Sequence, residues 1–234
     1  HVAKIRRTEV PYQGLVWCVT TRDSTFVMRR NGKVAITGNS SWAILRALWA
    51  ATRWPISVIY TSGVGITGYT QARINPIILS SPYLADRILD MDSLQQKRFS
   101  LRGRSEYDPD LIARASDRQR VMAADGTSTL YFTSGSSVRE AQARDADFLV
   151  HDEEDRSDPE AIEQYRSRLS GPGQFRWVAR LSTPTVPGYG IDRAYRQSDM
   201  RHWLIKCAGC GESSEMMWPG SVIPETWEEH LASH

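Results

Sequence analysis

The sequence predicts an α/β protein with a mostly parallel sheet, and three features of the chain lead to this prediction. From residue 40 onward, short runs of β-branched residues alternate with longer stretches of helix-forming residues. Such alternation is typical of parallel sheets, because a helix usually joins one parallel strand to the next. The first 38 residues are instead rich in strand formers and turns, and a Cys-x-x-Cys-Gly pattern lies near the end. We therefore expect three regions, at 1–39, 40–200 and 201–234.

The N-terminal region contains β-branched and aromatic runs at Leu15–Thr21, Thr25–Arg30 and Lys33–Thr37. Asn31-Gly32 separates the last two of these runs. An Asn-Gly pair between two such runs predicts a β-hairpin, because both turn positions need a positive φ. Residues 1–38 should therefore be β-rich and tightly turned.

The middle region begins with a helix. Ser40-Ser41 are capping residues, and good helix formers follow them as far as residue 51. Asp158-Pro159 predicts the start of another helix, which should end near residue 170, because aspartate caps helices and proline suits the first helical position. A further helical stretch covers 71–89. The expected strands are 56–61, 128–133, 147–151 and 175–182.

Composition and charge exclude several classes of protein. The chain has 234 residues, 41% of them hydrophobic and 24% charged, which suits a globular protein with a sizeable core. The formal net charge of +2 excludes a chain that is basic throughout but leaves room for a local basic groove. No apolar run approaches the roughly 20 residues of a membrane helix, and no signal-peptide pattern opens the chain. The three cysteines cannot all pair, which favours a reducing compartment, and the first residue, His1, indicates a piece of a longer product.

The junction Asn39-Ser40 carries a possible chemistry of its own. An asparagine side-chain amide can attack its own backbone carbonyl, form a succinimide and cut the chain after itself. A hydroxyl group on the next residue can hold an acyl group as an ester until that cut occurs. The alternative is an ordinary Asn-Ser turn.

Residues 1–39 resemble the C-terminal, Hint-type segment of an intein. The resemblance rests on the order and spacing of Tyr12–Cys18, Thr25–Lys33 and Ile36–Ser40. Cys18, where most inteins carry aspartate, together with Thr37 within the last of these segments, is similar to the class three inteins. The resemblance implies that Cys18 takes the upstream acyl group as a thioester and passes it to Ser40, after which Asn39 cyclises.

The intein resemblance has two departures. Gly38 stands where histidine often precedes the terminal asparagine. The N-terminal intein half would have to be supplied as a partner, so this chain alone should be unable to splice.

An apolar strand at residues 147–151 ends in the acids Asp152 and Glu153. In P-loop ATPases such an arrangement places the first carboxylate near Mg²⁺ and the second beside the attacking water. Nucleotide sites form at the carboxyl edge of such sheets. The alternative is an acidic loop that only closes the strand.

Residues 40–234 resemble the ATPase core of the large terminase subunit of tailed phages. The matching segments are Ala43–Trp49, Phe148–Asp155, Glu163–Leu169 and Leu181–Ile191. The resemblance implies an incomplete P-loop ATPase-type sheet that lacks its phosphate loop, preceded by the β-rich intein segment and followed by a zinc-knuckle-like segment. It also implies that the spliced product hydrolyses ATP to package double-stranded DNA, with the small terminase subunit and the portal or procapsid as partners. Such a product would act as a homo-oligomer in the host cytoplasm, away from membranes.

The same resemblance assigns roles to individual residues. Asp152 is the metal-side acid, Glu153 the catalytic acid, and Ser182-Thr183-Pro184 the element that couples hydrolysis to motion. Ser40 falls where the phosphate loop of the family ends in its hydroxyl residue, so an intein inserted there would split the nucleotide site. Ser40, Asp152, Ser182 and Thr183 are therefore the expected residues of an ATP–Mg²⁺ site.

Two further patterns have competing interpretations. Gly63–Gly68 fits G-x-G-x-x-G after an expected strand, with Asp86 eighteen residues beyond it, so a dinucleotide-binding oxidoreductase is an alternative function. Arg139 and Arg144 precede the acidic strand, where either could reach a phosphate or a neighbouring subunit. Such arginines more often pair locally or face solvent.

Cys207 and Cys210, in a C-x-x-C-G turn after a strand, predict a zinc ion. A tetrahedral site needs two more ligands, which could be His230 and His234, four apart on an expected helix, or a second cysteine pair beyond residue 234. The absence of a metal is the third possibility. A non-enzymatic zinc-containing nucleic-acid-binding module is accordingly another alternative function.

Overall fold

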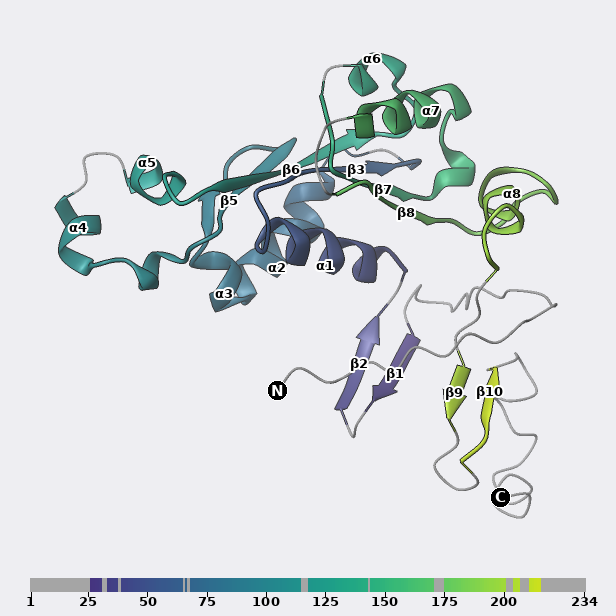
Figure 1. The fold of residues 1–234 in the computed structure, drawn as a ribbon, viewed down its shortest axis with the longest axis horizontal. Helices are drawn as coiled ribbons and strands as arrows, with labels where there is room; N and C mark the ends of the chain where they lie inside the picture. Colours follow the sequence, from purple (N-terminus) through teal and green to yellow (C-terminus); the bar gives the residue numbers. More distant parts are fainter. Residues whose placement is uncertain are drawn as a thin grey trace.

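A six-stranded sheet forms the centre of the structure (Figure 1). The computed structural model describes residues 26–30, 33–37, 39–64, 66, 68–114, 118–142, 144–170, 175–200, 204–206 and 211–215. In chain order the strands of this sheet are β3 (Ser57–Ser62), β4 (Ile88–Asp90), β5 (Gln96–Ser100), β6 (Thr127–Ser134), β7 (Phe148–Asp152) and β8 (Trp177–Leu181). In space their order is β4-β5-β6-β3-β7-β8.

The sheet is parallel over four of its strands. β6, β3, β7 and β8 are parallel neighbours, while β4 and β5 continue the sheet as antiparallel strands. The predicted α/β class with a mostly parallel sheet is therefore confirmed. The carboxyl ends of the four parallel strands lie at one edge, where α/β proteins form their sites.

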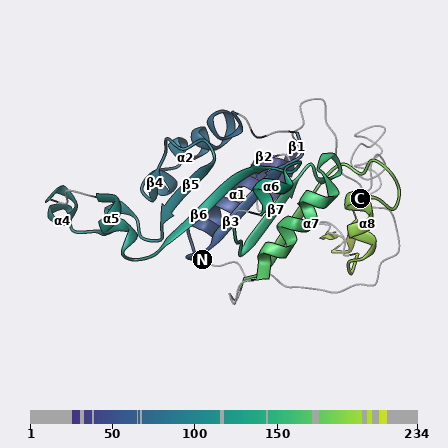
Figure 2. The ribbon, with the colours of Figure 1, turned by 90° about the horizontal axis from the view of Figure 1, so that it is seen from above.

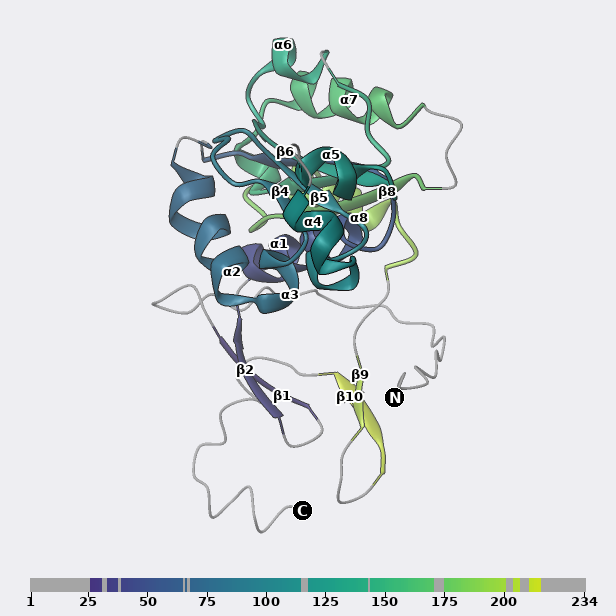
Figure 3. The ribbon, with the colours of Figure 1, turned by 90° about the vertical axis from the view of Figure 1, so that its left-hand side faces the viewer.

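Helices cover both faces of the sheet. The α-helices are α1 (Asn39–Ala51), α2 (Asn75–Ser80), α3 (Pro82–Ala85), α4 (Pro109–Arg114), α5 (Arg118–Ala123), α6 (Val138–Ala141), α7 (Pro159–Ser167) and α8 (Gly190–Arg196). Shorter turns are the π-helical η1 (Thr70–Ile74) and the 3₁₀ turns η2 (Arg104–Glu106), η3 (Glu154–Arg156) and η4 (Arg168–Ser170). α1, α2 and α3 lie on one face and α6 and α7 on the other (Figures 1 and 3). Seen from above, α4 and α5 lie beyond one end of the sheet and α8 beyond the other (Figure 2).

Most of the hydrophobic core is divided between these two faces, because successive residues of a strand point to opposite sides. On the α1 face, Ala43 and Ala47 of α1 share a buried cluster with Val58 of β3 and Val150 of β7. On the other face, Ile59 and Leu149 pack with Ala141 of α6 and Tyr165 of α7. In β3 and β7, even-numbered residues therefore face α1 and odd-numbered residues face α6 and α7.

Two small hairpins are separate from the central sheet. β1 (Phe26–Arg30) pairs antiparallel with β2 (Lys33–Thr37), and Arg30 is opposite Lys33. This pairing confirms the hairpin predicted from the two β-rich runs. β9 (Leu204–Lys206) pairs antiparallel with β10 (Ser213–Glu215). The strand expected at 15–21 lies outside the described residues, and the boundaries expected between the three regions stay predictions.

Most of the elements expected between residues 40 and 182 are present within a few residues of their predicted limits. α7 begins as predicted, because the Asp158 carboxylate accepts hydrogen bonds from the Glu160 and Ala161 amides and Pro159 follows at the first helical position. The helical stretch expected over 71–89 is present over residues 70–85 as the consecutive elements η1, α2 and α3, but its last residues are not helical. It is interrupted at Ser81, which is extended (φ −106°, ψ 107°) because the residue before a proline avoids the helical region, and it is followed by strand β4.

Within the part of the chain that the structure describes, no helix is long and apolar enough to cross a membrane.

Candidate active site

The carboxyl edge of the parallel strands is held together by main-chain hydrogen bonds. The Gly63 amide, just after β3, donates to the carbonyl of Asp152 at the end of β7 (3.0 Å). The Gly135 amide, just after β6, donates to the Ser62 carbonyl (3.0 Å), and the Asp158 amide donates to the Gly135 carbonyl (3.1 Å). The turns after three strands and the start of α7 therefore form one connected layer.

Residue 63, a glycine, has no room for a side chain, because the turn after β7 lies against its Cα atom. A Cβ atom on residue 63 would stand 2.2 Å from the Glu153 carbonyl oxygen. This is the first glycine of the G-x-G-x-x-G pattern, and its closeness to the β7 turn accounts for it without a bound pyrophosphate. The element after this pattern is the π-helical η1 rather than the helix that opens a dinucleotide site. The dinucleotide-binding alternative gains no support from this geometry.

Asp152 ends β7 with its side chain almost completely buried on the α1 face. The Tyr60 hydroxyl donates to Asp152 Oδ2 (2.6 Å), and the Tyr60 and Tyr69 hydroxyl oxygens are 2.9 Å apart. Burial, and then the negative charge of Asp152, raises the pKa of Tyr60 far above its usual value. Burial also raises the pKa of Tyr69, to about 12. Tyr60 is therefore a fixed neutral donor that holds one oxygen of the carboxylate.

Glu153 leaves the strand in a left-handed conformation (φ 55°, ψ 48°). For a residue other than glycine this conformation costs on the order of 1–3 kcal/mol, and such strain is concentrated at functional sites. The turn ends the alternation of β7, so the Glu153 side chain takes a direction different from that of Asp152. It is half-buried, and its carboxylate has no hydrogen-bond or ion-pair partner among the described residues.

The end of β8 lies beside these acids. Leu181 pairs with Asp152, so Ser182 and Thr183 follow directly at the same edge. Ser182 Oγ accepts a hydrogen bond from the Asp155 amide (3.0 Å), whereas Thr183 is exposed. The predicted residues Asp152, Glu153, Ser182 and Thr183 therefore meet at one edge of the sheet.

A partly buried ion pair lies beside this edge. Arg180 of β8 bonds Glu154 through two guanidinium nitrogens, and the Glu154 side chain is almost completely buried. The hydrogen bonds to Glu154 raise the pKa of Arg180. This ion pair fixes η3 to β8 and so fixes the turn that carries Glu153.

His151 occupies the opposite face of β7 from Asp152. Its Nδ1 lies 2.8 Å from Thr61 Oγ1, its Nε2 has no hydrogen-bond partner among the described residues, and the side chain is fully buried. Burial, helped by the charges of Arg180 and Arg166, lowers the pKa of His151 to about 3. A neutral imidazole that faces the α7 side takes no direct part in chemistry at Asp152.

Ser40 is the second residue of α1 and is half-buried. The N-terminal end of α1 lies on the side where the parallel strands have their carboxyl ends (Figure 1). Among the described residues, no hydrogen bond joins Ser40 to the acids or to the end of β8. The structure thus places Ser40 on the expected side of the sheet without completing a site around it.

The remaining predicted residues have varied positions. Thr37 ends β2 and Asn39 begins α1. Arg139 is exposed on α6, and the Arg144 guanidinium lies 4.5 Å from the centre of the Tyr131 ring, which is a local pairing. The predicted residues outside the described part of the chain are Cys18, Cys207, Cys210, His230 and His234.

Zinc and magnesium, the two metal ions predicted from the sequence, need different numbers of protein ligands. Within the described ranges, no group of three or more His, Cys, Asp or Glu residues could hold an ion, so the zinc assignment to the two cysteines stays a prediction. Mg²⁺ needs fewer protein ligands, because it is usually bound by one or two carboxylates together with phosphate oxygens and waters. Asp152 fits this role, since Oδ2 is held by Tyr60 while Oδ1 has no hydrogen-bond partner among the described residues.

Sequence reasoning did not identify three residues that contribute to this edge. Tyr60 and Tyr69 look like ordinary hydrophobic positions, and Asp155 looks like one more acid in an acidic run. The β3–β7 register, with Ser62 opposite Asp152, is what brings the Tyr60 hydroxyl to the carboxylate. A regular alternation gives Tyr60 and Asp152 the same face, but the pairing of β3 with β7 cannot be deduced from either strand alone.

The chain has similarities to known proteins. The model of the family described as phage terminase large subunit gpA, ATPase domain, matches residues 110–234. A crystal structure of the large terminase of a thermophilic bacteriophage is similar with a TM-score of 0.40 at 13% identity, covering 59% of this chain and 29% of that one. The same terminase in complex with ATP-γ-S gives 0.38 at 12% identity, covering 59% and 28%. The chain therefore spans less than a third of the length of these terminase structures. A search of the curated proteins found no match.

Proposed function

Because the chain belongs to the family of phage terminase large subunit gpA ATPase domains, we propose that it forms part of an ATPase that powers the packaging of viral DNA. In this proposal the whole protein acts on double-stranded DNA in the host cytoplasm, as an oligomer, with the small subunit and the portal as partners. The observation that carries the proposal is the divergence of two adjacent acids, Asp152 and Glu153, at the carboxyl edge of a parallel sheet.

The two acids suit different tasks because their surroundings differ. Asp152 is buried and has one oxygen held by the Tyr60 hydroxyl, so its other oxygen is presented in a fixed direction and would bind Mg²⁺. A bound Mg²⁺ supplies charge neutralisation to the phosphates of ATP. Glu153 is half-buried on a left-handed turn and has an unpaired carboxylate in the described structure, as a base that accepts a proton from the attacking water requires.

The direction of the helix crossovers supports a phosphate loop that ends at Ser40. The connections β6–α6–β7 and β7–α7–β8 both step toward β8 and both pass over the α6–α7 face. Crossovers between parallel strands are right-handed in nearly all proteins, so a crossover on the opposite face must step away from β8. α1 lies on that opposite face and leads into β3. The strand before α1 in such a unit therefore belongs beyond β8, whose outer edge has no partner among the described strands.

The same topology supports the proposal that an inserted segment interrupts the protein just before Ser40. The strand that precedes α1 in this chain is β2, which pairs with β1 in a separate two-stranded sheet instead of joining the central one. We propose that residues 1–39 are the C-terminal segment of an intein, and that splicing joins Ser40 to an upstream strand and phosphate loop. Asn39 and Ser40 open α1, so the proposed cut would fall at the start of that helix.

Substitution of the two acids in the spliced, full-length protein tests the ATPase proposal. Glu153→Gln should reduce ATP turnover by at least about 100-fold while ATP still binds, because glutamine keeps the shape of the side chain but cannot accept the proton. Asp152→Asn should instead raise the Mg²⁺ concentration needed for binding, because it removes charge from the metal side. Glu163→Gln, on the exposed face of α7, is the matched control. Full turnover by Glu153→Gln would show that the two acids only close a strand.

A further inference from the structure

One carboxylate holds the loop that follows β8. The Thr185 amide and the Thr185 hydroxyl both donate to Asp155 Oδ2, each at 2.9 Å. The Ile191 amide, in the first turn of α8, donates to Asp155 Oδ1 (2.8 Å). The Asp155 amide in turn donates to Ser182 Oγ (3.0 Å). A single residue of η3 thus bonds the beginning, the middle and the end of the loop Ser182–Ile191.

The close fit of Gly190 supports this arrangement. A Cβ atom on residue 190 would stand 2.2 Å from Asp155 Oδ1, and the residue has a φ of +47°, which glycine adopts easily. α8 contacts η3 as a result. The sequence of the loop therefore leaves room for the Asp155 carboxylate at the place where α8 begins.

The bonding of Asp155 distinguishes it from the neighbouring acids. Both oxygens of Asp155 are engaged with the loop, whereas Asp152 and Glu153 each keep an oxygen without a donor among the described residues. The charge of Asp155 is stabilised by two amides and a hydroxyl of the loop, an arrangement that fixes the position of the loop.

Asp155 and Glu153 belong to one rigid turn. The Arg156 amide donates to the Glu153 carbonyl (3.0 Å), and the Ser157 amide donates to the Glu154 carbonyl (2.8 Å). The ion pair of the buried Glu154 with Arg180 fixes the same turn to β8. A movement of the Glu153 backbone would therefore carry the Asp155 carboxylate with it.

We propose that Asp155 is a positioning residue that couples the Asp152–Glu153 turn to the loop Ser182–Ile191 and to α8. Through its three acceptor contacts, a change at the acids during ATP hydrolysis is transmitted to the loop, and from the loop to α8. This inference rests on the proposed ATPase function, since the turn moves in response to nucleotide only if the acids act on it.

Asp155→Asn is the sharpest test because asparagine has one side-chain acceptor oxygen where aspartate has two. Whichever way the amide is placed, its NH₂ group faces either the Thr185 or the Ile191 donors. The hydrogen bonds to that one residue of the loop are therefore lost. The size of the side chain is unchanged, and the fold should survive. Thr185→Val removes only the hydroxyl contact and should give a weaker effect of the same kind. Glu163→Gln again serves as the control.

Two measurements on these variants of the spliced, full-length protein decide the proposal. Hydrogen exchange of the Thr185 or the Ile191 amide should be at least about tenfold faster in Asp155→Asn than in the wild type and the control. The KM for ATP should stay unchanged while more ATP is consumed per length of DNA packaged, an uncoupling that a merely structural contact would not cause.

The outcomes separate this inference from the ATPase proposal. If Glu153→Gln abolishes hydrolysis but Asp155→Asn keeps wild-type exchange or a wild-type packaging yield per ATP, the ATPase proposal stands and the coupling role is wrong. If the wild-type protein hydrolyses no ATP, both fail, even where the amide exchange shows that Asp155 holds the loop.

Discussion

Among the four consecutive acids of residues 152–155, Asp152, Glu153 and Asp155 have three different environments. The difference is set by how many donors each carboxylate meets: one hydroxyl for Asp152, none within the described structure for Glu153, and three donors for Asp155. A carboxylate oxygen without a donor is available to a ligand, while the two oxygens of Asp155 are engaged in holding the donors of the loop. At the residue scale, the number of hydrogen bonds that each carboxylate accepts distinguishes these acids more clearly than their residue type does.

His151 gives a pH prediction at this scale. The pKa of His151 in the folded chain, about 3, is below the ordinary value of 6.5. Between these two pH values the unfolded chain binds a proton at His151 and the folded chain does not. This contribution to stability is therefore present above pH 6.5 and is lost as the pH falls from 6.5 toward 3, at about 1.4 kcal/mol per pH unit. Denaturant unfolding at pH 7, 6 and 5 measures it.

His151→Gln provides the comparison for that measurement. Glutamine can still bond Thr61 but does not titrate, so the free energy of unfolding of this variant should fall less between pH 6 and pH 5 than that of the wild type. Carboxylates titrate in both proteins and cancel in the difference. Equal slopes for the two proteins would mean that His151 accepts a proton in the folded state.

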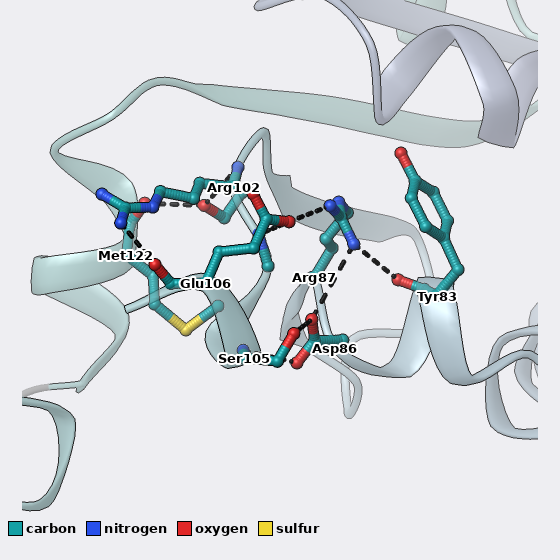
Figure 4. Close-up of polar contacts among 9 residues, drawn as sticks. Tyr83, Asp86, Arg87, Arg102, Ser105, Glu106 and Met122 are labelled. Atoms are coloured by element: carbon teal, nitrogen blue, oxygen red, sulfur yellow. Dashed lines mark hydrogen bonds and ion pairs between the residues drawn. The ribbon is translucent and has the colours of Figure 1, made fainter. Parts of the chain in front are cut away.

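At the scale of elements, the antiparallel end of the sheet depends on a polar cluster between α3 and η2. Figure 4 shows Arg87 between Glu106 and the Tyr83 carbonyl, while the Asp86 carboxylate accepts hydrogen bonds from the Ser105 amide (2.9 Å) and hydroxyl (2.6 Å). The same view shows Arg102 beside Glu106. These contacts join the turn before β4 to the loop after β5, where two short strands alone would give little stability.

Gly103 lies at the centre of this cluster and gives a prediction for it. A Cβ atom on residue 103 would stand 2.1 Å from Asp86 Oδ2, so Gly103→Ala must displace the carboxylate from its two bonds with Ser105. We expect a loss of about 1–3 kcal/mol in the free energy of unfolding, measured in urea.

A double-mutant cycle shows whether the clash is the cause. In an Asp86→Ala background the carboxylate is absent, so Gly103→Ala should cost clearly less than it does in the wild type. Additive losses for the two substitutions would place the effect of Gly103→Ala elsewhere in the loop.

At the scale of the whole molecule, α1 links two architectures that do not share a sheet. β1 and β2 form their own hairpin before it, and the six-stranded sheet follows it. Under the proposed splicing at the boundary between Asn39 and Ser40, this hairpin would be removed with residues 1–39, and the six-stranded sheet would gain the upstream strand.

Splicing of the precursor tests this boundary. With the upstream intein half supplied, Asn39→Ala should stop release at residue 39 while attack at the upstream junction continues, because only the asparagine amide can form the succinimide. Cys18→Ala should block formation of the branched intermediate, because the thiolate is the first nucleophile. Mass spectrometry of the products distinguishes the two. Normal ligated product from either variant would exclude the role given to that residue.

Sequence reasoning predicted the parallel strands well because each is a short apolar run bounded by turn residues, and it predicted α7 because Asp158 and Pro159 are strong start signals. It failed where the chain changes direction inside a helix-like composition. Residues 71–89 contain many helix formers, yet Pro82 forces Ser81 out of the helical region, and residues 88–90 pair with β5 instead. Pairing with a distant strand overrode local propensity there.

The sequence by itself determined the alternation of strands and helices, the β-hairpin before residue 39 and the positions of Asp152 and Glu153 at a strand end. These features follow from local rules, since a residue's neighbours in the chain fix periodicity, caps and turns. Only the tertiary structure decided that Tyr60 holds Asp152, that Gly63 makes room for the turn of Glu153 and that Asp155 holds the loop after β8. Each of these contacts joins residues 27 to 92 positions apart or depends on the order of the strands. That order results from packing the whole sheet, and no local pattern contains it.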